Sequence, residues 1–419
     1  MFSFLNYRIG FFLAVRQIRR SSIWTNVLIV FVMILTFLNL VVVSGILVGL
    51  IQGAVDAVRT HYISDIIIST PANKTYIENS QAVIAVLKNN PNIEHYTARY
   101  LTGTTIEGSY KTRIKTTDKS DVASASLTGI DPVAEDQVTN IKKFIVEGSF
   151  INPGDYDQVV LGSYLLKKYM PVDSPGFAVL SGDIGPGSKV RLTVGGIQHE
   201  VTVKGIVKSK IDEINMRVFM NDSQFRSLTG RNDFNVNEIS IKLKNGIDPI
   251  QVKNALVLNG VSRVAKVQTF DEAEPKFIKD MIATFAILGD LISSIGLVVA
   301  SITIFIVIFI NAITRRKFIG ILKGIGVSGQ AIEISYVLQS FFYAITGSVI
   351  GLVIVYGFLM PFINTHPIDF PFSDGILVAP LSSTLFRILL LILATVIAGY
   401  IPARMIVQKN TLDSILGRN

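Results

Sequence analysis

Two pairs of neighbouring residues combine a carboxylate with an imidazole: Glu94 with His95, and His199 with Glu200. Such side chains can transfer protons together when they lie within hydrogen-bond reach of each other and of a substrate. Both pairs fall in or beside segments that we expect to be strands, where neighbouring side chains point to opposite faces of the sheet. Neither pair therefore predicts an acid–base dyad.

Other chemistry-bearing residue types also lack the spacing that their chemistry needs. The chain has 4 His and no Cys, which excludes disulfides, and its His residues show no spacing typical of metal ligands. Ser109, Ser126 and Ser163 lack the strand–Gly-x-Ser-x-Gly–helix setting of a nucleophile elbow. The glycine-rich segment 182–189 lacks the Gly-Lys-Ser/Thr ending of a phosphate loop. We therefore expect a non-catalytic chain with no metal, no cofactor and no nucleotide-hydrolysing site of its own.

The distribution of apolar residues is far more informative. Of the 419 residues, 49% are hydrophobic, and they gather in runs at 27–51, 291–310, 337–358 and 385–401. A helix needs about 20 apolar residues to cross about 30 Å of hydrocarbon, and the runs are continuous rather than alternating. The sequence therefore predicts four transmembrane helices, with a stretch of more than 200 residues of less apolar composition between the first and the second.

Basic residues predict the orientation of these spans. Lys and Arg cluster before the first span, between the second and third, and after the fourth. The segment 361–375, in contrast, has no Lys or Arg and carries the acidic residues Asp369 and Asp374. The clustered residues are Arg8, Arg16, Arg19 and Arg20; Arg315, Arg316, Lys317 and Lys323; and Arg404, Lys409 and Arg418. Because Lys and Arg favour cytoplasmic loops, we expect both termini in the cytoplasm and the large domain outside the bacterial cytoplasmic (inner) membrane. The net charge of +8 thus follows membrane topology and predicts no nucleic-acid partner.

Small and polar residues mark particular places in the spans. Gly45 and Gly49, like Gly347 and Gly351, lie four residues apart, a spacing that lets helices approach closely. These glycines are candidate helix-packing positions, or simply the glycines common in membrane helices. Asp290 is expected to mark the outer edge of the second span, and Gln339 to make a hydrogen bond between helices.

The large domain begins and ends with similar halves. Each half reads as strand–helix–strand, with β-branched runs flanking a helical period; the segments are 65–69, 80–87 and 93–100, then 238–244, 249–258 and 263–270. Two such units predict a ferredoxin-like α+β sandwich. The insertion at about 102–229 is expected to be mainly β. Its predicted strands are 104–115, 123–130, 189–194 and 200–208, with a helix at 161–169 and a loop at 172–186.

The connection between the second and third spans is not a simple turn. Phe318, Ile321, Leu322 and Ile325 recur with helical spacing, and glycines then end the helix. A short basic and apolar helix at this place is either an anchor in the membrane interface or a docking helix for a cytoplasmic protein.

At this point the residues carry a resemblance. Segment 315–328 resembles the signature R-R-K/R-E-I-G-I-L-K-A-I-G-A-S of the FtsX/MacB-like (type VII) ABC transporter permeases, with Phe318 at the Glu position and Gly324 at an Ala position. The C-terminal segments 400–404 and 410–416 resemble the family's closing segment, with Thr411 where Pro is common. The N-terminal segment 14–20 resembles its opening amphipathic helix. In the large domain the segments 127–132, 146–148, 159–162 and 203–207 resemble the MacB-like periplasmic core.

The resemblance implies a function. Permeases of this family pair with a second permease subunit, as a homodimer or heterodimer, and a separate cytoplasmic ATPase, which binds ATP and Mg, docks beneath them. The implied ATPase-coupling residues are Arg315, Arg316, Ile319, Gly320, Lys323 and Gly326. Movement of the spans reaches the outer domain through helical stalks, here 52–62 and 271–290, which is called mechanotransmission.

The expected domains follow in order. They are 1–22, an amphipathic cytoplasmic helix; 23–53, the first span and stalk; 54–275, the outer domain; 276–312, stalk and second span; 313–332, the coupling helix; 333–359, the third span; 360–380, a short outer loop; 381–403, the fourth span; and 404–419, a cytoplasmic tail. The fold class is thus a four-span α-helical membrane protein with a large α+β extracytoplasmic domain.

Several alternatives stay open at this stage. The expected substrate is one such as a lipoprotein, a peptide or a small amphiphile, in a MacB-like efflux, Lol-like lipoprotein-release or FtsX-like system. The large size of the outer domain disfavours the FtsX-like system. Membrane lipid and a periplasmic adaptor or lipoprotein are further candidate partners. The alternative from another class is a membrane-anchored sensory or adhesion protein with no ATPase partner.

Overall fold

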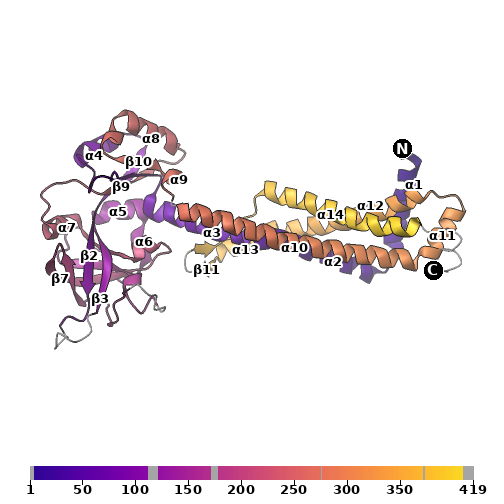
Figure 1. Cartoon of the computed structure of the whole chain (residues 1–419), viewed down its shortest axis with the longest axis horizontal. Helices are drawn as coiled ribbons and strands as arrows, with labels where there is room; N and C mark the ends of the chain where they lie inside the picture. The colour runs from indigo at the N-terminus through magenta and orange to yellow at the C-terminus, as the bar shows by residue number, and fades with distance from the viewer. Residues whose placement is uncertain (1–3, 112–120, 171–177, 275, 371–372, 409–419) are drawn as a thin grey trace. The chain divides into compact units, whose positions relative to one another are not determined.

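The computed structural model describes residues 4–111, 121–170, 178–274, 276–370 and 373–408. These residues form two compact units (Figure 1). The helical unit comprises Met1–Gly53, Lys279–Phe370 and Asp374–Asn419, and the α/β unit is mainly Ala54–Ile278. Each unit is described by itself below.

Four helices within the described residues are long and apolar enough to cross a membrane: Ile23–Ile63, Ala283–Thr314, Gly329–Thr365 and Leu381–Val407. Each predicted apolar run lies inside one of them, so the four-span prediction is confirmed. The first comprises α2 (Ile23–Leu38), the π-helical turn η1 (Asn39–Val43), α3 (Ser44–Val58) and a second π-helical turn, η2 (Arg59–Ile63). The others are α10 (Lys276–Thr314); α12 (Gly329–Ile354) with η6 (Val355–Leu359) and α13 (Met360–Thr365); and α14 (Leu381–Val407).

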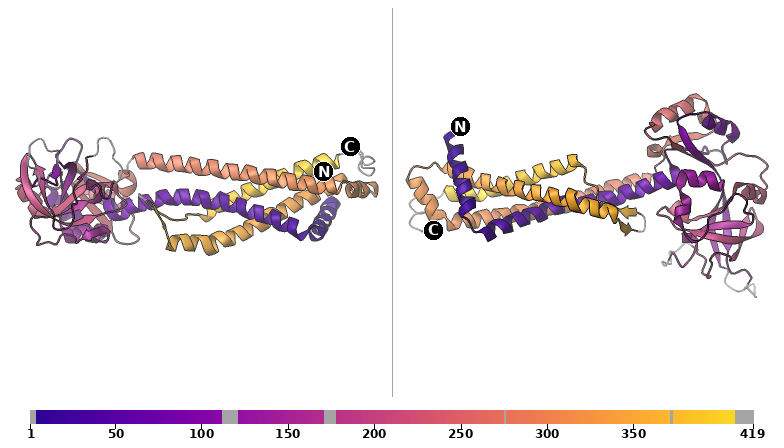
Figure 2. Two further views of the ribbon diagram at one scale, coloured as in Figure 1. Left: turned by 90° about the horizontal axis from the view of Figure 1, so that it is seen from below. Right: turned by 180° about the vertical axis from the view of Figure 1, so that it is seen from behind.

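The long helices of the helical unit run alongside one another (Figure 2). Met33, Phe37, Ile308 and Ile332 are at most 1% exposed and form the centre of this bundle. Outward-facing leucines and isoleucines are exposed, as expected of helices whose other face meets lipid. A short pair of strands, β11 (Ile368–Phe370) and β12 (Ser373–Gly375), lies in the connection between α13 and α14.

The two halves predicted for the α/β unit assemble as a ferredoxin-like sheet. Its strands lie in the order β10-β1-β9-β2, all antiparallel, which is the order expected when two strand–helix–strand units interleave. The elements are β1 (Ile66–Ser69), α4 (Ser80–Lys88), β2 (Ile93–Glu107), β9 (Glu238–Leu243), α8 (Pro249–Leu258) and β10 (Lys266–Thr269). The apolar side chains of both helices and all four strands contribute to one core.

The sheet continues into the region predicted as an insertion. β2 pairs with β9 through its first half and with β3 through its second half, so ten strands of the described chain form one connected sheet. The further strands are β3 (Val122–Ile130), β4 (Ile145–Gly148), β5 (Gln158–Gly162), β6 (Lys189–Val194), β7 (Ile197–Val207) and β8 (Arg217–Asn221). The further helices are α5 (Pro132–Thr139), α6 (Asp212–Asn215), α7 (Asp222–Thr229) and α9 (Phe270–Ala273). The mainly β character is confirmed, but the region shares a strand with the sandwich.

Three local predictions were wrong. The segment 161–169 is not a helix: Leu161 and Gly162 end β5, and a single 3-10 turn (Ser163–Leu165) follows. Val159, Val160 and Leu161 are fully buried between β7 and β8, and a buried apolar run of this length cannot be assigned from periodicity alone.

The other two errors concern strand ends. The strand predicted at 104–115 is the second half of β2 and ends at Glu107. The strand predicted at 263–270 is confined to Lys266–Thr269, because Val261–Arg263 form a 3-10 turn and Phe270 begins α9. Residues 112–115 of the first, and 172–177 of the predicted loop, lie outside the described residues.

Candidate functional site

The predicted helix between the second and third spans is α11 (Arg316–Gly324). It begins after a break at Arg315 and ends at Gly324. Gly326 then adopts a φ of +95°, which only glycine adopts readily. Ser328 caps α12, because its Oγ accepts a hydrogen bond from Ala331 N at 3.2 Å. This helix, turn and cap place α11 at one end of the bundle.

The structure separates the six residues assigned to ATPase coupling into two groups. Ile319, which is 3% exposed, and Gly320 are buried against the bundle, and Lys323 Nζ donates to Val407 O of α14 at 2.9 Å. These three residues hold α11 in place in this structure. Arg315 and Arg316 are half-buried at the start of α11, and Gly326 is exposed in the turn that ends it.

The exposed face of α11 is apolar. Phe318, Ile321 and Ile325 are 56%, 51% and 73% exposed, which agrees with both interpretations of this helix, as an interfacial anchor or as a docking helix. Their neighbours complete a groove of about 830 Å³ between α11 and α1 (Phe4–Arg20). Phe12 and Leu13 add apolar surface to this groove, and four cations rim it: Arg16, Arg20, Arg315 and Lys317.

Helix α1 is fixed across the start of α12 by small and polar contacts. A Cβ at Gly10 would lie 2.7 Å from Ile334 Cγ2, so only glycine permits this approach. Gln339 Nε2 donates to Gln17 Oε1, which confirms the predicted role of Gln339 in a hydrogen bond between helices. Ser328 Oγ donates to Asn6 Oδ1 at 2.9 Å. The contribution of α1 to the groove could not be predicted, because its contacts join residues more than 300 positions apart.

The four candidate packing glycines all lie at close approaches, but not all against helices. A Cβ at Gly347 or Gly351 would meet Met33 or Phe37, so these positions bring α12 against α2. A Cβ at Gly45 would lie 2.9 Å from Val378 O, and one at Gly49 would overlap Ile376 O. The first pair permits helix packing, whereas the second lets the extended segment before α14 lie on α3.

A second notable arrangement surrounds the end of the first long helix, inside the α/β unit. The helix ends in the π-helical turn η2, and Ser64 then takes a φ of +64°, which turns the chain into β1. Tyr62 lies in this last turn. Its carbonyl accepts hydrogen bonds from Arg99 Nη2 at 3.0 Å and from Ser240 Oγ at 3.1 Å.

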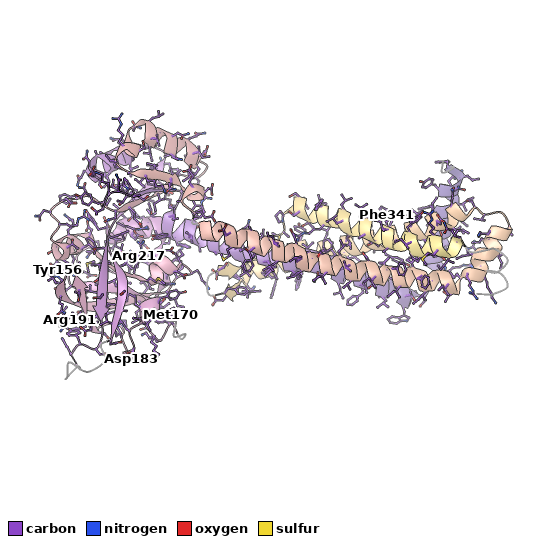
Figure 3. The ribbon with its side chains drawn as sticks, viewed as in Figure 1. Tyr156, Met170, Asp183, Arg191, Arg217 and Phe341 are labelled. Atoms are coloured by element: carbon purple, nitrogen blue, oxygen red, sulfur yellow. The ribbon has the colours of Figure 1, made fainter. Side chains whose placement is uncertain are left out.

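Two arginines also hold the Tyr62 side chain. The guanidinium carbons of Arg99 and Arg217 lie 5.2 and 4.9 Å from the centre of its ring, within the range of cation–π attraction. Arg217 Nη2 donates to the Tyr62 hydroxyl, and Arg217 lies among the strands of the domain (Figure 3). Carbonyl, ring and hydroxyl of one residue are thus all fixed to strands.

Buried carboxylates balance the two arginines. Arg99, 1% exposed, binds Glu135 of α5 through two parallel bonds of 2.9 and 2.7 Å, and its Nη1 donates to Glu238 Oε1 at 2.6 Å. Arg217 Nη1 lies 3.5 Å from the same Glu238 oxygen. Burial alone would lower the pKa of Arg99, but Glu135 and Glu238 outweigh it and raise that pKa. Burial alone would raise the pKa of Glu238, but Arg217 and Arg99 hold it below its usual range.

The sequence did not predict this network, which consists of Tyr62, Arg99, Glu135, Arg217 and Glu238. One feature of the sequence could have indicated it, namely charged residues within predicted strands. Arg99 and Glu238 both lie in runs of otherwise β-forming residues. Charged residues of this kind are almost never fully buried unless they are paired. The sequence does not identify the partners, which lie 36 and 139 positions from Arg99.

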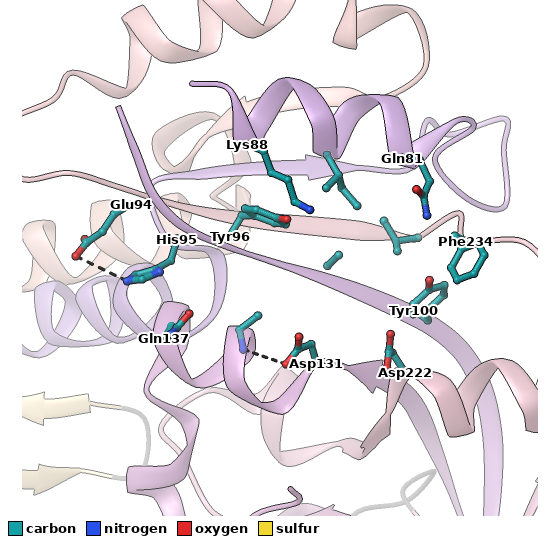
Figure 4. A pocket seen from close by; sticks show the side chains of 14 residues that line it. Gln81, Lys88, Glu94, His95, Tyr96, Tyr100, Asp131, Gln137, Asp222 and Phe234 are labelled. Atoms are coloured by element: carbon teal, nitrogen blue, oxygen red, sulfur yellow. Dashed lines mark hydrogen bonds and ion pairs between the residues drawn. The ribbon is translucent and has the colours of Figure 1, made fainter. Parts of the chain in front are cut away.

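The α/β unit also carries a surface cleft of about 480 Å³ between α4, β2 and the starts of α5 and α7 (Figure 4). Tyr96, Tyr100 and Phe234 give it aromatic surface, and Asp131 and Asp222 give it carboxylates. Asp131 is engaged as the cap of α5, with Oδ1 accepting from Val133 N at 2.9 Å. The described residues that line the cleft include no Ser, Thr or Cys, so they offer no nucleophile of these types.

Glu94 and His95 both line this cleft, so the expectation that they point to opposite faces was wrong. A register shift between Ile93 and His95 in the pairing of β2 with β9 breaks the alternation of side chains. His95 Nε2 lies 4.0 Å from Glu94 Oε1, too far for a hydrogen bond. Their arrangement still forms no hydrogen-bonded dyad.

The second acid–base pair is also unsuited to proton transfer. Hydrogen bonds from Lys189, Tyr110 and Lys111 lower the pKa of Glu200 to about 2. So acidic a carboxyl group is a poor base at neutral pH.

Comparison with known families matches both parts of the chain. Residues 27–257, more than half of the chain, match the family model of the MacB-like periplasmic core domain, and residues 291–411 match that of the FtsX-like permease C-terminal region. Two curated relatives, each named "Macrolide export ATP-binding/permease protein MacB" and from strains of Campylobacter jejuni, are 24% identical over 191 residues. That match covers 45% of this chain and 28% of each relative, so the chain spans about a quarter of their length.

Solved structures were also compared. The periplasmic region of MacB from Actinobacillus actinomycetemcomitans is 15% identical, with a TM-score of 0.35, over 54% of this chain and 95% of that one. The extracellular domain of the noncanonic ABC-type transporter YknZ from Gram-positive bacteria is 14% identical, with a TM-score of 0.33, over 49% and 98%. The two family-model matches lie in the expected order along the chain, and they establish that it belongs to the MacB/FtsX-like permease family of ABC transporters.

Proposed function

We propose that this chain is the permease subunit of an ABC transporter and passes the work of a separate ATPase to its α/β unit by mechanotransmission. In this proposal it catalyses no reaction itself. It pairs with a second permease subunit in the bacterial inner membrane. The α/β unit faces outward, and the transported or extracted substrate is a lipoprotein, a peptide or a small amphiphile.

The groove between α1 and α11 is the observation that carries the proposal. It joins exposed Phe318 and Ile321 to a rim of four cations, a combination that suits an acidic protein surface with an apolar centre. Ile319 and Lys323 fix α11 to the bundle, so force applied to the groove would reach the spans. Phe318 takes the place of the family's usual Glu, so apolar contact would replace a carboxylate contact at this point.

The network around Tyr62 supports the transmission step. A helix that transmits movement to a domain must be firmly attached to that domain at its end. Tyr62, in the last turn of the first long helix, is held at its carbonyl, ring and hydroxyl by buried and paired charges. Such an anchor would pass a displacement of the first span to strands β2, β8 and β9.

The docking proposal is tested by affinity purification. Full-length tagged chain, extracted from its native membrane in mild detergent, should recover a P-loop ATPase identified by mass spectrometry. Replacing Phe318 and Ile321 by Asp should reduce the recovered ATPase at least about tenfold, because about 1.4 kcal/mol of lost contact corresponds to that factor. Ile319→Asp is a poor choice, because it would place a carboxylate in the core.

Leu258→Asp is the matched control. Leu258 is 88% exposed at the end of α8, so the same chemical change there should leave ATPase recovery unchanged. If the wild-type chain recovers no ATPase, the chain acts without one and the sensory or adhesion alternative replaces the proposal. Equal recovery by the Phe318/Ile321 variant and the wild type would reject the groove as the docking site.

A further inference from the structure

A cavity of about 560 Å³, lined by both polar and apolar side chains, lies within the helical unit between α10, α14 and the π-helical turn η1. Its charged residues are Arg387 and Asp290, and its hydroxyls come from Ser293, Ser294, Ser382 and Ser383. Ionisable residues are rare in membrane spans and usually mark a function. Arg387 lies inside the predicted apolar run 385–401, where nothing else in the run signals a binding role.

Arg387 is held by the irregular turn of the first span. Its Nη1 donates to Leu40 O at 2.7 Å, and its Nη2 donates to Ser44 Oγ at 2.6 Å. Leu40 lies in η1, and a π-helical turn shifts the backbone pairing, a distortion that is frequent at functional sites. The guanidinium has five N–H donors, and within the described residues these two make hydrogen bonds. Arg387 is thus fixed in position with donors to spare.

The lining is graded from polar to apolar along the helices. Both α10 and α14 run in from the same end of the bundle, and the charged residues stand near that end. Asp290 directly precedes the apolar run 291–310, and Arg387 lies about 9 Å along the axis from the start of α14. Deeper in the bundle the lining includes Leu297, about two turns beyond Asp290 on α10, and Leu390, about one turn beyond Arg387 on α14. This order matches an amphiphile whose head lies at the membrane surface and whose chain enters the hydrocarbon.

The charges select the kind of head. Arg guanidinium binds phosphate oxygens through paired hydrogen bonds, and the serine hydroxyls can donate to the same phosphate. Asp290, which is exposed, would repel a purely anionic head but attract an ammonium group. We propose that this cavity binds the phosphoethanolamine head of a phospholipid, with the phosphate on Arg387 and the ammonium on Asp290. The proposal concerns the spans alone and holds whether or not an ATPase partner exists.

Native mass spectrometry of the full-length chain, released from detergent and titrated with defined lipids, tests the proposal. The wild type should bind phosphatidylethanolamine at least about fivefold more tightly than phosphatidylglycerol, since about 1 kcal/mol corresponds to that factor. Asp290→Asn should remove this preference, because phosphatidylglycerol lacks the ammonium that Asp290 attracts. Arg387→Gln should weaken binding of both lipids.

Two controls keep the result specific. Asp280→Asn removes an exposed carboxylate from the same helix, outside the cavity, and should leave the lipid preference unchanged. Soluble glycerophosphoethanolamine, which has the head but no acyl chains, should bind at least about tenfold more weakly, because burying apolar chains contributes much of lipid affinity. Equal wild-type affinity for the two lipids, an unchanged preference in Asp290→Asn, or equal binding of the soluble head would each overturn the proposal. Because Asp290 is exposed, the Asp290→Asn result stands even if Arg387→Gln fails to fold.

Discussion

Arg99 is a buried residue of the α/β unit that binds two buried carboxylates at once. Its replacement by Met keeps much of the volume but leaves Glu135 and Glu238 buried without their shared partner. Breaking a buried ion pair in this way costs about 3–5 kcal/mol. We expect Arg99→Met to lower the stability of the α/β unit by this amount, measured by pulse proteolysis of the full-length protein in detergent.

The pair of Lys253 and Glu272 provides a matched control for Arg99. Lys253 Nζ lies 2.5 Å from Glu272 Oε1, but both side chains reach solvent. Exposed pairs contribute about 0–1 kcal/mol, so Lys253→Met should change the free energy of unfolding little. A similar loss in both variants would show that the network around Tyr62 is no more important than a surface pair.

The same network predicts acid sensitivity. Interactions with Arg217 and Arg99 keep the pKa of Glu238 below its ordinary value of 4.5 in the folded chain. A carboxyl group with a depressed folded pKa stabilises the fold above its unfolded pKa, and that stabilisation is lost as the pH falls through the folded pKa. The α/β unit should therefore lose stability as the pH drops below about 4.5. Glu238→Gln should be less stable at neutral pH but depend less on acid, which urea titrations monitored by proteolysis at several pH values would show.

For single residues, the sequence allowed us to predict some roles but not which other residues each side chain would meet. Gln339 was expected to bond between helices and does so. Asp290 was expected only to mark the edge of a span, whereas it shares a cavity with Arg387. Arg387 and Asp290 are almost a hundred positions apart, and no periodicity links residues on different helices.

Among the helices, the contact of α12 with α2 offers the clearest test. A Cβ at Gly351 would overlap the Phe37 ring, whereas a Cβ at Gly357, in η6 of the same span, would meet nothing within 4 Å. Overpacking in a close contact costs about 1–3 kcal/mol, and Ala favours helix over Gly by about 1 kcal/mol. Gly351→Ala should therefore lower the thermal midpoint of the detergent-solubilised protein, measured by circular dichroism, and Gly357→Ala should leave it unchanged or raise it. Equal shifts would contradict the packing role of Gly351.

Element positions were predictable where a period was strong and lengths were distinctive. The long apolar runs and the two strand–helix–strand halves were of this kind, and α11 was found from the spacing of Phe318, Ile321 and Ile325. What the apolar face of α11 contacts was not predictable, because an apolar stripe looks alike whether it meets the membrane interface or a partner protein. The continuity of β2 was also missed, because a strand that belongs to two parts of one sheet gives no boundary signal.

For the whole molecule, the family match explains why a domain is placed between the first and second spans, but the direction of insertion still depends on charge placement. The proposed docking site at α11 lies beside the end of α14, whereas the proposed lipid site lies near its start, so the two sites are expected on opposite sides of the membrane. Four crossings place α11 and the connection 360–380 on opposite sides, since one span separates them. The orientation can therefore be tested by labelling a few single-residue substitutions.

The absence of Cys from the sequence makes this test direct, because any introduced Cys is the only thiol in the chain. Two of the variants are Leu258→Cys in the α/β unit and Ile368→Cys in the connection 360–380. Both should react with a membrane-impermeant maleimide in cells whose outer membrane has been made permeable and whose inner membrane is intact. Lys317→Cys on α11 should react only after the inner membrane is disrupted, because basic loops are retained in the cytoplasm. All three positions are at a described and exposed surface, so a lack of labelling would not result from burial. Labelling of Lys317→Cys from outside would show that the orientation is the reverse of the one expected, with the groove where no ATPase can reach it. Labelling of Ile368→Cys and Lys317→Cys from the same side would refute the single span between these two positions.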